Sequence, residues 1–395
     1  NNGKVDTFNK PQGIFVNDDG ELYIADTDNA RIVHLDSEGN FLREIGPPTG
    51  EIIPDDFQYR PTALVEGKGK SIYVVALGVN QGLLEFDKDG IFRGYVGAPK
   101  ITTTMIEYFW KLIATQEQRE RMQDFVPTEY NNIDIDEEGF IYVTTSTISV
   151  EDIRSAINSR SSSDIGAPVR KLNPTGDDIL RRYGYFPPVG DILFRSRGYA
   201  ESGNSQFVDV CVEQYGIYTV LDKRKGRIFT YDSDGNLLYI FGGLGNRLGT
   251  FRNPVAIDII NNNYIVLDNI TGYITVFEPT EYGKLIKDAI ALHQQGKYDE
   301  STAKWQEVLE LNANLELAYI GMGKAYLRKD DFKNAMKYFK LGNKRDYYSN
   351  AFKLYRKEVI GDNFGLVVTG IVFIMIVWRM YLKTRHGKGV QEWKY

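Results

Sequence analysis

Residues 11–46 read PQGIFVNDDGELYIADTDNARIVHLDSEGNFLREIG and contain four short apolar runs. The turns between these runs are built from Asp, Gly, Ser and Asn, which enter tight turns and positive φ angles readily. The runs have the length of β-strands and alternate between apolar and polar residues, so they predict half-buried antiparallel strands. The stretch therefore predicts a four-stranded antiparallel unit.

The same pattern returns along the first 280 residues, at 61–97, 127–184, 207–242 and, in part, 254–277. A recurring four-stranded unit of about 40–45 residues is typical of a β-propeller, in which neighbouring blades bury each other's faces. The fifth unit lacks its last strand, and we expect residues at or before the present N-terminus to complete it. Five blades and six blades are both left open.

The first unit follows a pattern of Pro, Gly, Tyr, Asp, Asn and Arg positions that resembles the NHL repeat family. The resemblance implies an all-β propeller fold for residues 1–279. The fourth unit keeps Asp222 and Arg227 at the spacing of Asp26 and Arg31. We interpret these repeated pairs as ion pairs that brace turns, because a single active site would not need the same pair in several blades.

Two insertions interrupt the blades, at 101–125 and at 149–168. The first predicts a helix that carries large apolar residues, and exposed residues of this kind favour a partner. The alternative is that this helix packs on its own propeller. The candidate partner-binding residues are Met105, Phe109, Trp110 and Ile113.

After Pro279 the apolar period changes from that of strands to that of helices. Two segments repeat at an interval of 34 residues, which resembles the tetratricopeptide repeat (TPR) and implies helical hairpins over residues 280–362. A third helix at 346–360 is expected to cap the pair. Such repeats bind peptides or partner helices, although a rigid spacer is equally open. The matched positions are Tyr298 with Phe332, Ser301 with Ala335, and Trp305 with Phe339.

Residues 364–378 read FGLVVTGIVFIMIVW and contain no charge. With the residues that flank this run, 363–382 are long enough to cross a membrane. Trp378 is an interfacial residue, and Arg379 can extend its charged end to the headgroups. Gly365, Thr369 and Gly370 permit close packing against another membrane helix.

Five basic residues lie on each side of the span, so the charge count alone does not decide its orientation. The net charge is −6, yet five Lys or Arg and one Glu lie between Arg379 and Tyr395, so the rest of the chain is strongly acidic. An acidic body argues against nucleic-acid binding. The five basic residues just before the span belong to a folded region, and such regions cross membranes largely regardless of charge. We therefore expect the tail 383–395 in the cytoplasm and the propeller outside, on the cell membrane.

Residues with catalytic chemistry are few. His34, His293 and His386 lie in different parts of the chain, so no zinc site is expected. Cys211 lies within an apolar strand and is interpreted as an inert core residue. Asp134, Asp209 and Asp258 are expected at equivalent positions of three first strands, which in a propeller line the central channel. They are weak candidates for a Ca²⁺ site, and no other cofactor is expected.

Chains that combine NHL repeats, TPR helices and one span resemble accessory proteins of Gram-positive-type bacteria. The resemblance implies a scaffold or protein-interaction subunit of a membrane complex, with transporter subunits as the leading partners and carbohydrate as a ligand class. We expect no enzyme activity. The alternatives are a lactonase-type hydrolase or lyase that uses the channel carboxylates with a divalent cation, and a glycan-binding module without chemistry.

Overall fold

The computed structural model describes residues 6–54, 56–97, 129–145, 167–182, 190–191 and 203–387, with side chains described as far as residue 384. The chain divides into two compact units, Asn1–Thr280 and Glu281–Tyr395. Described residues of the first unit form strands and two 3₁₀ turns, whereas those of the second form helices. This change confirms the switch of period after Pro279.

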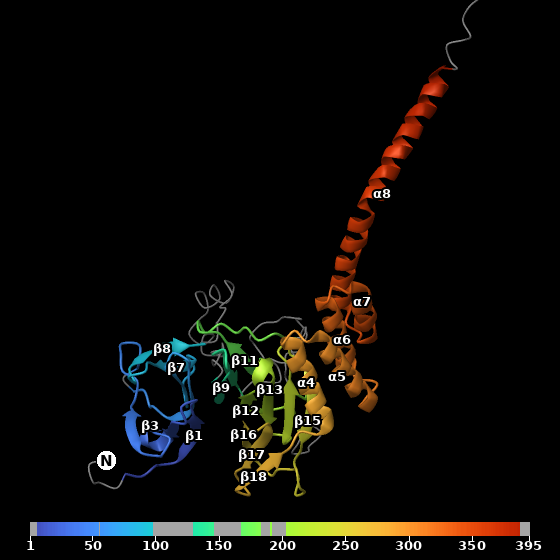
Figure 1. Cartoon of the computed structure of the whole chain (residues 1–395). Coiled ribbons are helices and arrows are strands. Elements are labelled where there is room, and N and C mark those ends of the chain that lie inside the picture. Colours follow the sequence, from blue (N-terminus) through green and yellow to red (C-terminus); the bar gives the residue numbers. More distant parts are fainter. Residues whose placement is uncertain are drawn as a thin grey trace, which may run out of the picture. The chain divides into compact units, whose positions relative to one another are not determined.

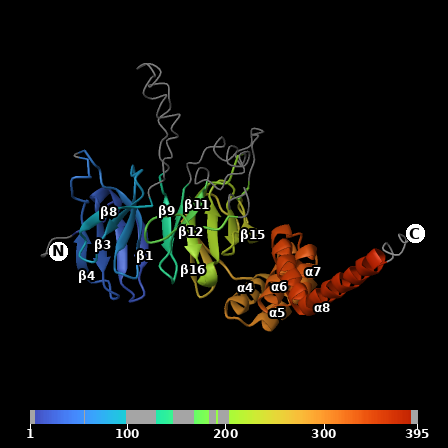
Figure 2. The same cartoon turned by 90° about the horizontal axis from the view of Figure 1, so that it is seen from above.

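The first unit is a five-bladed propeller whose blades follow one another in chain order (Figures 1 and 2). Blade 1 comprises β1 (Pro11–Val16), β2 (Leu22–Asp26), β3 (Arg31–Leu35) and β4 (Phe41–Ile45). Blade 2 comprises β5 (Pro61–Glu66), β6 (Ile72–Ala76), β7 (Leu83–Phe86) and β8 (Phe92–Val96). Blade 3 comprises β9 (Asn132–Ile135), β10 (Ile141–Thr144) and β11 (Val169–Leu172), with a bridge from Leu172 to Asp178. Short 3₁₀ turns lie at Thr27–Asn29 and Gln214–Gly216.

Blade 4 is complete and blade 5 is not. Blade 4 comprises β12 (Phe207–Val212), β13 (Tyr218–Asp222), β14 (Arg227–Tyr231) and β15 (Leu237–Gly242). Blade 5 comprises β16 (Pro254–Ile260), β17 (Asn263–Asp268) and β18 (Tyr273–Phe277), so its three strands leave β18 at the edge. The sequence predicts that this blade lacks its fourth strand within residues 254–277.

Apolar side chains from facing blades form the core of the propeller. Between blades 1 and 2, for example, Tyr23, Ala25 and Ile32 meet Leu64 and Val74, and all five are buried. A side chain at position 13 would collide with the backbone of Thr62, so this close approach of two blades requires glycine.

The innermost strands pack in the order β1–β5–β9–β12–β16, and no comparable contact joins β16 to β1 among the described residues. The described N-terminal residues lie on blade 1, where the Asp6 carboxylate bonds to Arg31 and the Asn9 N–H donates to Asp26. They therefore do not complete blade 5. The expectation that residues at the present N-terminus complete blade 5 is therefore wrong for residues 6–10, which the structure describes.

The second unit begins with two helical hairpins. They comprise α4 (Glu281–Gln294), α5 (Tyr298–Leu311), α6 (Glu316–Arg328) and α7 (Phe332–Leu341). The residues matched at the 34-residue interval are buried where the TPR resemblance predicts: Ser301, Ala335, Trp305 and Phe339 are at most 3% exposed. Gly323 lies against Phe339, and an added Cβ there would be 2.6 Å from that ring. Close helix packing therefore requires glycine at position 323.

The last helix, α8 (Arg345–Gly387), runs without a break from the helical repeats through the whole apolar run (Figure 1). Its first turns cap the second hairpin, with Ala351 buried and the Tyr347 ring stacked on Phe339 at 5.3 Å. The sequence predicts a capping helix and a separate span, whereas the structure has one helix for both. No proline interrupts the helix, and Gly361, which lies between the cap and the apolar run, is accommodated inside it.

Candidate functional site

Two carboxylates near the propeller axis join neighbouring blades. Asp134 of blade 3 accepts a hydrogen bond from the Val212 N–H of blade 4 at 2.7 Å. Asp209 of blade 4 accepts one from the Ile257 N–H of blade 5 at 2.6 Å. Each carboxylate also accepts the N–H of the residue that follows it, at 2.8 Å. Asp258, on the last blade, accepts only the Ile259 N–H at 2.7 Å. The first two carboxylates therefore brace the ring.

The strand register corrects the expected equivalence of these three residues. Asp134 lies opposite Tyr142, the second residue of β10, and Asp258 lies opposite Ile265 of β17. The position that matches them in blade 4 is Cys211, opposite Thr219. Asp209 lies two residues earlier on the same face. The bulge between Phe207 and Asp209 does not cause this offset, because blade 5 has the same bulge between Pro254 and Ala256.

The environment of the two bracing carboxylates favours their protonated forms. Burial raises the pKa of Asp134 to about 7, although the two N–H donors oppose this rise. Burial also raises the pKa of Asp209 well above its ordinary value. The charge of Asp258 adds to both effects. Among the described residues, no group of three or more His, Cys, Asp or Glu side chains is arranged to hold a metal ion.

Asp222 and Arg227 do not form the ion pair that the repeat predicts. Arg227 bonds instead to Asp191, at 2.5 Å. The Asp222 carboxylate accepts the N–H groups of Gln206 and Arg224, both at 2.9 Å, and so ties the strand to its turn. In blade 1 the predicted pair does form, with 2.9 Å between Arg31 and Asp26.

The shared role of these aspartates is to accept backbone N–H groups at the start of a blade. Asp26 accepts the Asn9 N–H at 2.7 Å. Asp268, at the same place in blade 5, accepts the Arg252 N–H at 2.5 Å. The interpretation as a structural brace therefore holds, but its essential partner is the backbone rather than arginine.

Sequence reasoning misses a hydroxyl network between blades 4 and 5. The Tyr264 hydroxyl donates to Glu213 at 2.5 Å and lies 3.1 Å from the Tyr239 hydroxyl and 3.3 Å from Thr219. Burial, with the nearby Glu213 charge, raises the pKa of Tyr264 far above its ordinary value. Tyr218 of blade 4 holds the position equivalent to Tyr264 in the strand register, and this recurrence of tyrosine is the signal that could have pointed to the position.

His34 lies in β3 within a second polar cluster. Its Nε2 is 3.1 Å from a Glu21 carboxylate oxygen, and its Nδ1 accepts from Arg43 at 3.3 Å. The imidazole stacks on the Tyr23 ring at 3.9 Å. Burial lowers the pKa of His34, while Glu21 opposes this. Both nitrogens are occupied by protein groups, so His34 serves the fold of blade 1.

One described helix, α8, is long and apolar enough to cross a membrane, with a mean hydropathy of 2.1 over its most apolar window. None of that window is buried by other parts of the chain. The helix geometry separates the residues predicted to pack: Gly365 and Thr369 share one face and Arg379 returns to it, whereas Gly370 lies about 100° away from Thr369. The Thr369 hydroxyl donates to the Gly365 carbonyl at 2.7 Å.

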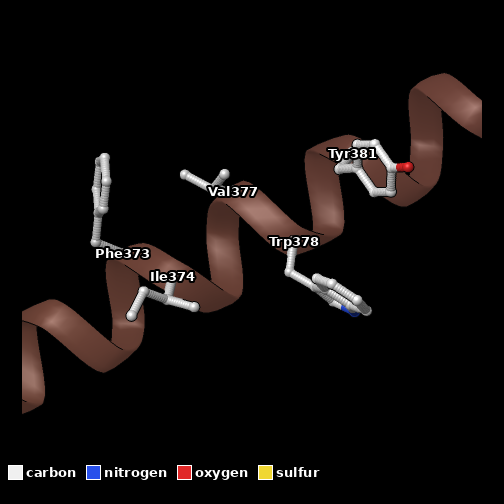
Figure 3. A pocket seen from close by; sticks show the side chains of 5 residues that line it. All are labelled: Phe373, Ile374, Val377, Trp378 and Tyr381. Carbon is white, nitrogen blue, oxygen red and sulfur yellow. The ribbon is translucent and has the colours of Figure 1, made fainter.

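The opposite side of α8 carries an open apolar groove of about 380 Å³ (Figure 3). Trp378 belongs to the lining of this groove. At about 100° per residue, it lies on the other side of the helix from Gly365. The two aromatic rings near the end of the span, Trp378 and Tyr381, are 6.2 Å apart. This is the position that interfacial aromatics take in membrane helices. The lining residues are Phe373, Ile374, Val377, Trp378 and Tyr381.

Other predicted sites lie outside the described residues. They are the candidate partner-binding residues Met105, Phe109, Trp110 and Ile113.

Cys211 is described and is 2% exposed, and burial raises its pKa. A thiol that is buried and held protonated is a poor nucleophile, as expected for a core residue.

Comparisons with known proteins agree with this architecture. Residues 8–35 match the NHL repeat and residues 290–330 match a TPR repeat. The chain therefore carries an NHL repeat in blade 1 of its five-bladed propeller and a TPR repeat in its helical unit, followed by one described helix that is long and apolar enough to span a membrane. No curated protein matches it.

Several solved structures are similar at low identity. Virginiamycin B lyase from Staphylococcus aureus is 15% identical over 69% of this chain and 71% of that chain, with a TM-score of 0.35. A nidogen/laminin complex is 14% identical over 68% and 80%, with a TM-score of 0.40. A putative gluconolactonase is 10% identical over 70% and 76%, with a TM-score of 0.40.

Proposed function

We propose that this protein is a membrane-anchored scaffold subunit that binds other membrane proteins outside the cytoplasm, as an accessory to a transport complex. The proposal rests on the combination of two repeat modules with one apolar helix. Propellers and TPR helices offer broad rigid surfaces for partners, and a single span tethers them to a membrane.

The observation that carries this proposal is the continuity of α8. Ala351 packs on the helical repeat, and the uncharged run begins at Phe364 within the same helix. A helix rises about 1.5 Å per residue, so the repeat is held about 20 Å from the start of the apolar run. A stiff connection of this kind suits a scaffold that must present a binding surface at a defined height above a membrane.

The carboxylates near the axis give little support to the lactonase-type alternative. Asp134 and Asp209 each direct oxygens at two backbone N–H donors. A divalent cation there would have to displace these donors or compete with their partial positive charges. The proposed role is therefore binding rather than catalysis. We propose transporter subunits as the partners and carbohydrate as the class of ligand.

A native pull-down tests the proposal. The protein is extracted from its own membrane in mild detergent, and the proteins that accompany it are measured by mass spectrometry. We expect integral membrane subunits, transporter components among them, in stoichiometric amounts. Recovery of the protein alone, together with metal-dependent hydrolysis of lactones by the purified chain, would overturn the proposal in favour of an enzyme.

A further inference from the structure

The part of α8 that precedes the apolar run carries its opposite charges on different sides. Lys353, Arg356 and Lys357 fall within an arc of about 100°, because each residue of a helix turns by about 100°. We call these three residues the basic face. Glu358 and Asp362 lie about 100–180° around the helix from them. All five side chains are exposed.

The basic face has no acidic neighbour on its own helix. Residues three and four apart are neighbours on a helix surface, and no such neighbour of the basic face is Asp or Glu. Lys353 and Lys357 are themselves four residues apart, a spacing at which like charges destabilise a helix. Among the described residues, none forms an ion pair with the basic face. An anion from outside the chain would therefore relieve this repulsion.

The basic face leads directly into the apolar run. Ile360 lies within the same arc, and Phe364 follows it one turn later. At about 1.5 Å per residue, Arg356 lies about 12 Å and Lys357 about 10 Å before Phe364 along the helix axis. The headgroup layer extends about 5–8 Å beyond the hydrocarbon core. Lys and Arg side chains are long enough to extend toward this layer from just above it.

A tilt of α8 would bring the basic face still closer to the membrane surface. Membrane helices are tilted by about 20° on average. A tilt toward the basic face lowers Arg356 and Lys357 and raises Asp362, which lies on the other side only two residues before the apolar run. The opposite tilt would bring Asp362 to the headgroups instead. Acidic lipids favour the first tilt and oppose the second.

We propose that the basic face of α8 binds the headgroups of anionic phospholipids. Arg356 and Lys357 contact the lipid phosphates, and Lys353, one turn further from the membrane, adds its charge. The 57% exposed Ile360 enters the interface beside them. The inference rests on the membrane anchoring in the proposed function, and it deepens that function by naming the lipid that sets the tilt of α8.

The lipid preference of the full chain, reconstituted in phosphatidylcholine bilayers, tests the proposal. Electron spin resonance of spin-labelled lipids measures how much more strongly phosphatidylglycerol, which is anionic, associates with the span than phosphatidylcholine does. The basic residues after the span also attract anionic lipids, so the test is the change caused by substitution. Arg356→Gln combined with Lys357→Gln should lower the preference at least about threefold. An unchanged preference would overturn the proposal.

A matched pair of variants controls for net charge. Lys333→Gln combined with Lys340→Gln removes the same charge from two exposed positions of α7, away from the apolar run. We expect this pair to leave the lipid preference unchanged. An equal fall for both pairs would overturn the proposal, because total charge and not the basic face would then attract the lipid.

A charge exchange tests which side of α8 binds. Arg356→Glu combined with Glu358→Arg keeps the net charge and moves the guanidinium about 160° around the helix. We expect the preference for phosphatidylglycerol to fall at least about twofold, because a carboxylate then faces the headgroups on the basic side. A preference equal to that of the parent chain would contradict the assigned face.

Further results separate this inference from the scaffold function. If the chain does not float with the lipid vesicles, the anchoring is wrong and both proposals fail. If Arg356→Gln combined with Lys357→Gln keeps the lipid preference but loses subunits in the native pull-down, the basic face binds an acidic protein and the lipid inference alone fails. If the lipid preference changes as expected but no subunits are recovered, the scaffold function alone fails.

Discussion

Asp134 carries its carboxyl group in a place that favours the protonated form. Its pKa in the folded protein is raised from 3.8 to about 7 by burial. Folding therefore favours proton binding between these values, so this group contributes stability below pH 4 and loses that contribution as the pH rises through 7. The sign is opposite to that of an aspartate held by an ion pair.

Asp134→Asn should remove this pH dependence. The free energy of unfolding of the wild type, minus that of the variant, should fall by about 4 kcal/mol between pH 4 and pH 8. Urea unfolding at a series of pH values measures the difference. A flat difference for Asp134→Asn would refute the assignment of its pKa.

Gly323 is a second residue whose role comes from its neighbours. A methyl group there would meet the Phe339 ring inside the helical repeat. Gly323→Ala should therefore lower the free energy of unfolding of the helical unit by about 1–3 kcal/mol, through overpacking. Urea unfolding followed by helical circular dichroism measures the change.

Gly361→Ala makes the same substitution in a helix where nothing lies within 4 Å of the added Cβ. It should be neutral or stabilising by about 0.5–1 kcal/mol, because alanine favours a helix. Equal losses from the two variants would mean that helix propensity, rather than contact with Phe339, governs position 323.

Among the elements, α8 is the one whose continuity the sequence does not predict. Its residues between Ala351 and Phe364 contain no proline, and the exposed Gly361 does not interrupt the helix. The helix therefore continues through the expected boundary at 362–363. Two features that the sequence divides between segments, the cap of the repeat and the apolar run able to span a membrane, lie in one continuous helix, which we expect to be rigid.

Arg356→Pro tests this rigidity. Proline removes one backbone hydrogen bond and clashes with the preceding turn, at a cost of about 3 kcal/mol. Spin labels on Asn350→Cys and Asp362→Cys should be about 18 Å apart along an unbroken helix. We expect a narrow distance distribution that broadens with proline and stays narrow with Arg356→Ala. A broad distribution in the parent chain would contradict a rigid rod.

At the scale of the whole molecule, the buried Cys211 makes the orientation of the chain measurable. As the single cysteine it is 2% exposed, so the parent chain should resist labelling. We expect Asp89→Cys, on the exposed surface of blade 2, to react with an impermeant maleimide on intact cells. Gln391→Cys, in the basic tail, should react only after permeabilisation. The reverse pattern would place the propeller in the cytoplasm.

The sequence by itself determined the repeat, the strand-forming runs, the change of period after Pro279 and the apolar run. These features are local, since strand alternation and helix periodicity are written in residues a few positions apart. The burial of Ser301 and Phe339 follows from the same kind of pattern.

Only the tertiary structure decided which groups meet. The strand register places Asp209 two positions from the place of Asp134, and Arg227 bonds to Asp191 rather than to Asp222. Residues far apart in sequence also create the cross-blade bond from Val212 to Asp134. Such contacts depend on register and on the packing of whole blades, which no short pattern of residue types contains.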